Sequence, residues 1–161
     1  MREIEVKAKL RDKTDFLRQA QKLGVVFESP IVQSDTVFEC ALEHDDPNWN
    51  IFRLRNQNGS TILTMKHKAS DRSRDNFEYE TSIGEVDQVI KILERLGYKK
   101  SVSINKKRSI AKYNDLELCL DEVEELGSFV EIERMAEIQV TRIGIFRLRA
   151  IMETLQQVLL I

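Results

Sequence analysis

The chain has 161 residues, which suits one domain with a substantial hydrophobic core. Its 42% hydrophobic and 32% charged residues are ordinary for a folded soluble protein, and the formal net charge of −2 argues against a general nucleic-acid binder. No leader-like segment and no apolar stretch approaching the ~20 residues of a membrane span is found, so a cytoplasmic protein without a membrane partner is expected.

The first predicted strand alternates charged and apolar residues. Glu3, Glu5 and Lys7 share one face, while Ile4 and Val6 share the other, because side chains on a strand alternate with a period of two. Taken alone, such a strand is more typical of a solvent-facing sheet surface than of a binding site.

Two helices are predicted between groups of strands. Apolar residues recur at helical spacing over 13–23 and over 86–96, and Gly24 and Gly97 can end these helices. Each helix follows an acidic alternating strand and precedes further strands.

This order indicates a single domain built from two related halves. The halves span about 1–75 and 76–135, and they are followed by a tail at 137–161 that is predicted to be helical. Because the tail ends in an apolar run, either a monomer or a homodimer is expected.

Six further segments repeat the charged alternation of the first strand. They are 52–55, 62–66, 77–80, 106–108, 116–121 and 131–133. The pair Asn58-Gly59 predicts a hairpin that makes the first two of them antiparallel neighbours. Agreement among seven segments favours a shared charged surface over seven unrelated solvent-facing strands.

That surface would combine cations and carboxylates. The cations are Lys7, Arg53, Arg55, Lys66, Lys106 and Arg108, and the carboxylates are Glu3, Glu5, Glu78, Glu80, Glu117, Asp121, Glu131 and Glu133. Guanidinium and ammonium groups bind phosphate oxygens, and carboxylates bind hard divalent cations. The mixture therefore predicts a site for a polyanion accompanied by metal ions.

This ordered set of motifs resembles the CYTH domains, also called triphosphate tunnel metalloenzymes, over residues 1 to about 135. The matching motifs are ExExK (Glu3, Glu5, Lys7), RxR (Arg53, Arg55), a lysine on the next strand (Lys66), an acidic pair (Glu78, Glu80), KxR (Lys106, Arg108) and a closing acidic run (Asp121 and 126–133). Segments 33–38 and 126–133 are most similar to the class IV adenylyl cyclases and their CyaB-like relatives.

The resemblance implies an α+β fold, namely a closed antiparallel eight-stranded β-barrel with helices packed outside. It implies catalytic and substrate-binding roles for Lys7, Arg53, Arg55, Lys66, Lys106 and Arg108, and substrate binding by Glu78 and Glu80. It also implies that Mg²⁺ or Mn²⁺ is bound by Glu3, Glu5, Asp121, Glu131 and Glu133.

The leading interpretation is a divalent-metal-dependent enzyme that hydrolyses a triphosphate, either inorganic or organic, such as thiamine triphosphate or a nucleoside triphosphate. The alternative is a class IV adenylyl cyclase, which makes cyclic AMP and pyrophosphate from ATP. A third possibility is a non-catalytic module that binds polyphosphate or nucleotide. A lipocalin-like barrel for an apolar ligand is disfavoured, because such a cavity should be mostly apolar.

The remaining candidates have simpler interpretations. Cys40 and Cys119 are too few and too far apart to define a metal–thiolate site, and reduced thiols are expected. His44 and Trp49 belong to a predicted loop at 41–50, and His67 is predicted to lie on a strand surface.

Overall fold

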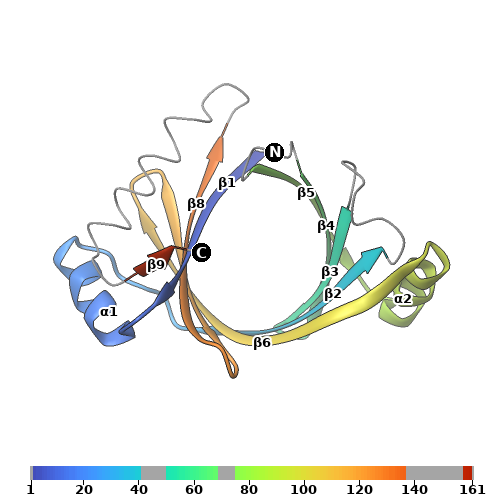
Figure 1. The fold of residues 1–161 in the computed structure, drawn as a ribbon, viewed down its shortest axis with the longest axis horizontal. Coiled ribbons are helices and arrows are strands. Elements are labelled where there is room, and N and C mark those ends of the chain that lie inside the picture. The colour runs from blue at the N-terminus through green and yellow to red at the C-terminus, as the bar shows by residue number, and fades with distance from the viewer. Residues whose placement is uncertain (1, 41–49, 69–74, 137–157, 161) are drawn as a thin grey trace. The chain divides into compact units, whose positions relative to one another are not determined.

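The computed structural model describes residues 2–40, 50–68, 75–136 and 158–160 (Figure 1). The elements in chain order are β1 (Arg2–Leu10), α1 (Lys13–Lys22), β2 (Ile31–Cys40), β3 (Asn50–Gln57), β4 (Ser60–Lys68), β5 (Asp75–Ile83), α2 (Val86–Arg95), β6 (Tyr98–Tyr113), β7 (Leu116–Val123), β8 (Gly127–Ala136) and β9 (Val158–Leu160). All seven charged alternating segments lie in strands, as predicted. No helix in these ranges is long and apolar enough to cross a bilayer.

Both predicted helices are confirmed. Helix α1 begins after Asp12, whose side chain accepts a hydrogen bond of 3.0 Å from the backbone N–H of Asp15. Beyond the ends of α1 and α2, Gly24 and Gly97 have φ angles of 78° and 91°. This left-handed conformation suits glycine and ends a helix.

The hairpin predicted at Asn58-Gly59 is also confirmed. The two residues have φ angles of 52° and 77°, so both central positions of the turn are left-handed. Such turns match the right-handed twist of the flanking strands. As a result β3 and β4 pair antiparallel, starting with Gln57 opposite Ser60.

The described residues group into two compact units. The first unit contains 1–31 and 106–161, and the second contains 32–105. In the first unit β6 pairs with β7, β7 with β8, β8 with β1, and β1 with β9. In the second unit β2 pairs with β3, β3 with β4, and β4 with β5. All these pairs are antiparallel.

Each unit has its own hydrophobic core. In the first, Phe16 of α1 packs with apolar residues of β1, β7 and β8, including Val6, Leu118 and Ile132, all of which are buried. In the second, Leu93 of α2 clusters with residues of β2 and β3. Because strand side chains alternate, the face opposite the first core carries Glu5, Lys7, Glu117, Asp121, Glu131 and Glu133.

The prediction of a closed eight-stranded barrel is wrong. The described residues form nine strands rather than eight. The ninth strand pairs with Ala8–Leu10 of β1, so the chain's own C-terminal residues take up this part of β1's second edge. The antiparallel pairing and the two helices agree with the α+β class.

The helix predicted for 137–161 is wrong at its end, because Val158–Leu160 forms strand β9. The other residues of that tail lie outside the described part of the chain, as do His44 and Trp49. His67 lies on β4, where its Nδ1 is 3.0 Å from Oδ1 of Asn50.

Candidate functional site

A completely buried carboxylate, Asp121, organises the charged face of the first unit. Asp121 accepts a hydrogen bond of 2.7 Å from Nζ of Lys106, and bonds of 2.6 Å from both Nε and Nη2 of Arg108. A buried charge is costly unless it is paired and hydrogen-bonded. Here one carboxylate holds two cations in fixed positions.

Glu131 is a second buried carboxylate on this face. It forms ion pairs with Nζ of Lys7 and with Nη2 of Arg108. Burial alone would raise the pKa of Glu131, but the charges of Arg108 and Lys7 outweigh it and lower the pKa to about 2. Burial likewise opposes protonation of Lys7, yet the charge of Glu131 leaves the pKa of Lys7 raised.

Lys106 behaves differently from Lys7. Burial and then the nearby charge of Arg108 lower the pKa of Lys106, and the attraction of Asp121 does not fully offset them. The side chains of Lys106 and Arg108 are only 7% and 10% exposed, whereas that of Lys7 is 42% exposed. Lys7 is therefore the most accessible of the three cations.

Three carboxylates gather next to these cations. One oxygen each from Glu5, Glu131 and Glu133 lies within 4.8 Å of the others. Glu5 and Glu133 are register partners on β1 and β8, which explains why their side chains meet. Three carboxylate oxygens are ligands that suit a hard divalent cation such as Mg²⁺ or Mn²⁺.

One member of this group, Glu133, has a raised pKa. Burial is the main cause that raises the pKa of Glu133 to about 7, and the like charges of Glu131 and Glu5 add to it. Arg108 acts in the opposite direction, with its Nη1 at 3.8 Å from Oε1 of Glu133, but does not compensate. A cation held between the carboxylates would favour the charged form of Glu133.

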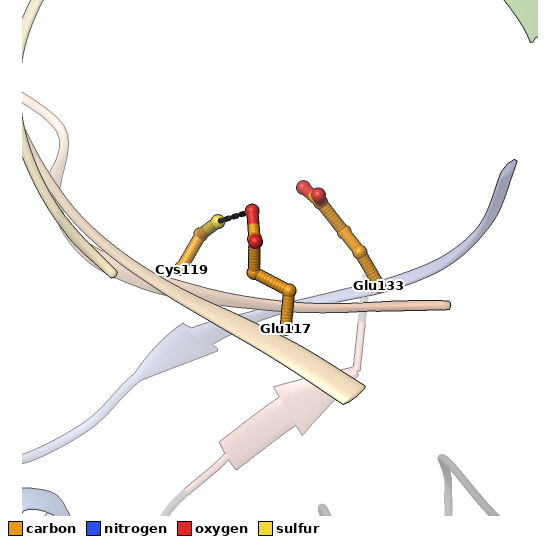
Figure 2. Close-up of side chains that lie close together, drawn as sticks. All are labelled: Glu117, Cys119 and Glu133. Carbon is orange, nitrogen blue, oxygen red and sulfur yellow. Dashed lines mark hydrogen bonds between the residues drawn. The ribbon is translucent and has the colours of Figure 1, made fainter. Parts of the chain in front are cut away.

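A second group includes a residue that the sequence reasoning missed. Oxygens of Glu117 and Glu133 and the sulfur of Cys119 also lie within 4.8 Å of one another (Figure 2). The signal in the sequence is the place of Cys119 between Glu117 and Asp121 in an alternating strand, which puts it on the charged face. Burial, before the effects of neighbouring charges, raises the pKa of the Cys119 thiol well above its usual range.

The second unit contains its own charged cluster, built around Arg55. Its Nε and Nη2 each donate a hydrogen bond of 2.8 Å to a different oxygen of Asp35, which is buried and lies opposite Arg55 in the register of β2 and β3. Asp35 was not predicted as a site residue. The signal in the sequence is that Gln33 and Asp35 are two positions apart, so both polar side chains lie on the same face of β2.

Arg53 and Lys66 lie near the acidic pair of β5. Nη2 of Arg53 is 3.1 Å from Oγ1 of Thr64 and 3.3 Å from Oε1 of Glu80, and Lys66 forms an ion pair with Glu78. Nε of Arg53 is buried and makes no hydrogen bond within the described residues. Glu78 and Glu80 thus position cations in this unit.

The predicted site residues therefore fall into two groups, one in each unit. The first unit holds Lys7, Lys106, Arg108, Glu5, Asp121, Glu131 and Glu133, and the second holds Arg53, Arg55, Lys66, Glu78 and Glu80. Glu3 pairs through its backbone with Met135, and its side chain lies outside the described part of the structure.

Residues 1–157 match the model of the CYTH domain family. A protein of Methanocaldococcus jannaschii, provisionally named an adenylate cyclase, is 33% identical over 135 residues, which cover 83% of this chain and 77% of the relative.

Solved structures show the same fold. A protein of Pyrococcus horikoshii matches with a TM-score of 0.79 and 26% identity, over 98% of this chain and 94% of the other. A Hippeastrum protein, described as an adenylyl cyclase candidate with a dominant triphosphatase activity, matches with a TM-score of 0.64 and 18% identity, over 96% of this chain and 88% of the other.

Proposed function

The chain belongs to the CYTH domain family, and on this basis we propose that it is a divalent-metal-dependent enzyme that hydrolyses a triphosphate. The observation that carries the proposal is the gathering of Glu5, Glu131 and Glu133 beside Lys7 and Arg108 on one face of the first unit. A metal-bound polyanion is the ligand that would use both kinds of charge.

The three carboxylates fit the ion that the proposal needs. Glu5, Glu131 and Glu133 would hold Mg²⁺ or Mn²⁺, which when bound would neutralise phosphate charge and lower the pKa of a coordinated water. Burial, and after it the like charges of Glu131 and Glu5, raise the pKa of Glu133 to about 7, and a bound cation would favour the charged form of this carboxylate.

The cations would bind and orient the phosphates. Lys7 is the accessible one, and its ion pair with Glu131 keeps it at the carboxylate group. Asp121 holds Lys106 and Arg108 in place, so they would present fixed positive charge without reorganising. By the family pattern, Arg53, Arg55 and Lys66 would bind further phosphate oxygens, with Glu78 and Glu80 positioning Lys66 and Arg53.

Hydrolysis requires fewer recognition features in such a site than cyclisation does. Phosphoryl transfer depends mainly on positioning and electrostatic stabilisation, and water as nucleophile requires no recognition of a base or ribose. The activity described for the Hippeastrum protein is of this kind. The charges on this face would bind a polyanion and a metal ion, which are the features that this reaction requires.

Adenylyl cyclisation is the second candidate, favoured by the name of the Methanocaldococcus jannaschii relative. The same charges would bind ATP, but the ribose 3′-hydroxyl would attack the α-phosphorus and release pyrophosphate. The two reactions therefore differ in the attacking oxygen and in the products.

A product-resolved assay tests both candidates. The purified protein is incubated with ATP, inorganic triphosphate or thiamine triphosphate, each with Mg²⁺ or Mn²⁺, and the products are separated by anion-exchange chromatography. Orthophosphate release supports hydrolysis, and cyclic AMP with pyrophosphate supports cyclisation. Phosphate-compound binding without turnover of any of these would replace the proposal with a non-catalytic binding module.

The carboxylate role has its own test. Glu5→Gln should abolish metal-dependent turnover, because it removes one ligand atom's charge at nearly constant size. Glu122→Gln is a matched control, since Glu122 is exposed and lies on the opposite face of β7 from Asp121. Full activity of Glu5→Gln in a folded protein would contradict the metal assignment.

A further inference from the structure

A thiol lies among carboxylates on the charged face of the first unit. Glu117 and Cys119 are two positions apart on β7 and therefore share a face, and Glu133 of β8 is the register partner of Glu117. Figure 2 shows the three side chains pointing toward one another, with Sγ of Cys119 at 3.9 Å from Oε1 of Glu117. The pairing of two strands thus brings together three potential ligands.

Cys119 is not placed like an ordinary core cysteine. A buried cysteine usually packs as a small hydrophobic residue, and Leu118 and Leu120 on either side do lie in the core. Cys119 points to the other face and is completely buried there, with its sulfur directed at carboxylates. Cys119 is therefore placed to act as a ligand and does not pack in the hydrophobic core.

We propose that Glu117, Cys119 and Glu133 form a site for a thiophilic divalent cation of the zinc class. One sulfur and two carboxylate oxygens are ligands that Zn²⁺ accepts, and its usual four-coordinate geometry leaves one position for water. Sulfur discriminates against Mg²⁺, which prefers oxygen ligands. A second cysteine is not needed.

This site and the three-carboxylate group share Glu133. The other ligands differ, because one group adds Glu5 and Glu131 while the other adds Glu117 and Cys119. An ion in one group would therefore weaken binding in the other. Zinc-class ions would therefore inhibit turnover by weakening metal binding at the three-carboxylate group. Only this consequence rests on the proposed function.

Cadmium is the probe for the site, because a cadmium–thiolate bond has a charge-transfer band in the ultraviolet. The full chain is titrated with Cd²⁺ in a thiol-free reductant. The band should saturate at one ion per chain, persist in Cys40→Ser and vanish in Cys119→Ser. Cys40 is the matched control, since it is the other free cysteine and belongs to no such group within the described residues.

A second variant keeps the thiol and changes its neighbour. Glu117→Gln should retain the band but weaken Cd²⁺ binding by at least about tenfold. Losing a residue that only hydrogen-bonds to a metal ligand already weakens metal affinity by about this much. Mn²⁺ binding, followed by electron paramagnetic resonance, should be retained in Cys119→Ser and weakened in Glu5→Gln. Circular dichroism checks that each variant is folded.

The outcomes separate this site from the proposed function. Absence of the band in the unmodified chain, its persistence in Cys119→Ser, or unchanged Cd²⁺ affinity in Glu117→Gln would overturn the site. A chain that binds Cd²⁺ through Cys119 but turns over no triphosphate would overturn the proposed function and leave the site standing.

Discussion

Arg108 and Asp121 face each other across β6 and β7 and are joined by two hydrogen bonds of 2.6 Å. Asp121 also accepts a bond from Lys106 and has no exposed surface. The pair therefore places two cations at fixed positions on the charged face, and the stability of the first unit depends on keeping the carboxylate.

Asp121→Asn should be strongly destabilising. The substitution keeps the size of the side chain but removes the charge that balances buried Lys106 and Arg108, and breaking a buried pair in this way costs about 3–5 kcal/mol. Urea unfolding gives the change in the free energy of unfolding. Glu122→Gln, which removes an exposed ion pair with Lys13, should cost about 1 kcal/mol or less. Equal effects of the two changes would contradict the anchoring role.

The stability of the metal-free protein should fall as the pH rises from about 4.5 to about 7. In this window Glu133 keeps its proton in the folded state, with a pKa of about 7, but loses it in the unfolded state. The folded state then binds more protons, so raising the pH favours unfolding, by on the order of 3 kcal/mol.

Glu131 affects stability in the opposite direction, and over a different pH range. Its pKa of about 2 stabilises the folded state above pH 4.5, and this stability is lost as the pH falls toward 2. The combined contribution of Glu131 and Glu133 to the free energy of unfolding should therefore be greatest near pH 4.5. Urea unfolding in the presence of a chelator measures it. Glu133→Gln should remove the decline between pH 4.5 and 7, and a variant that keeps the full decline would contradict the assignment.

The alternation of charges predicted much of this structure from the sequence. It identified strands at all seven segments and placed Lys106 with Arg108, and Glu5 with Lys7, on shared faces, because the period of a strand is fixed locally. Which residues pair across strands was not accessible in this way. The pairing of Asp35 with Arg55, and of Glu117 with Glu133, depends on register, which tertiary packing and turns decide.

The end of the chain shows a different limit. Val158–Leu160 is a short apolar run, and periodicity alone cannot distinguish a strand from a helix over so few residues. The run forms a strand because Ala8–Leu10 of β1 offers an edge with unpaired backbone groups. The predicted eight-stranded barrel did not include this pairing of β1 with β9.

Arg55 and Asp35 should be energetically coupled in the second unit. Each is largely buried and their two hydrogen bonds are charge-assisted, so Arg55→Ala and Asp35→Ala should each cost about 3–5 kcal/mol, and the double variant much less than their sum. A double-mutant cycle by urea unfolding measures the coupling. The pair Arg18–Asp15 is the control, because the Arg18 side chain is 62% exposed, and its expected coupling is about 1 kcal/mol or less. Additive effects at Arg55 and Asp35 would show that the pair does not stabilise the unit.

Removing residues 158–161 should loosen one edge of β1. The amides of Ala8–Leu10 that point toward β9 would lose their partners, so their hydrogen exchange should accelerate, while the amides directed at β8 keep theirs. Exchange measured by NMR resolves individual amides and so compares the two sets within one strand. Acceleration confined to the β9 side is expected. Unchanged exchange at all of Ala8–Leu10 would mean that β9 does not protect this edge in solution.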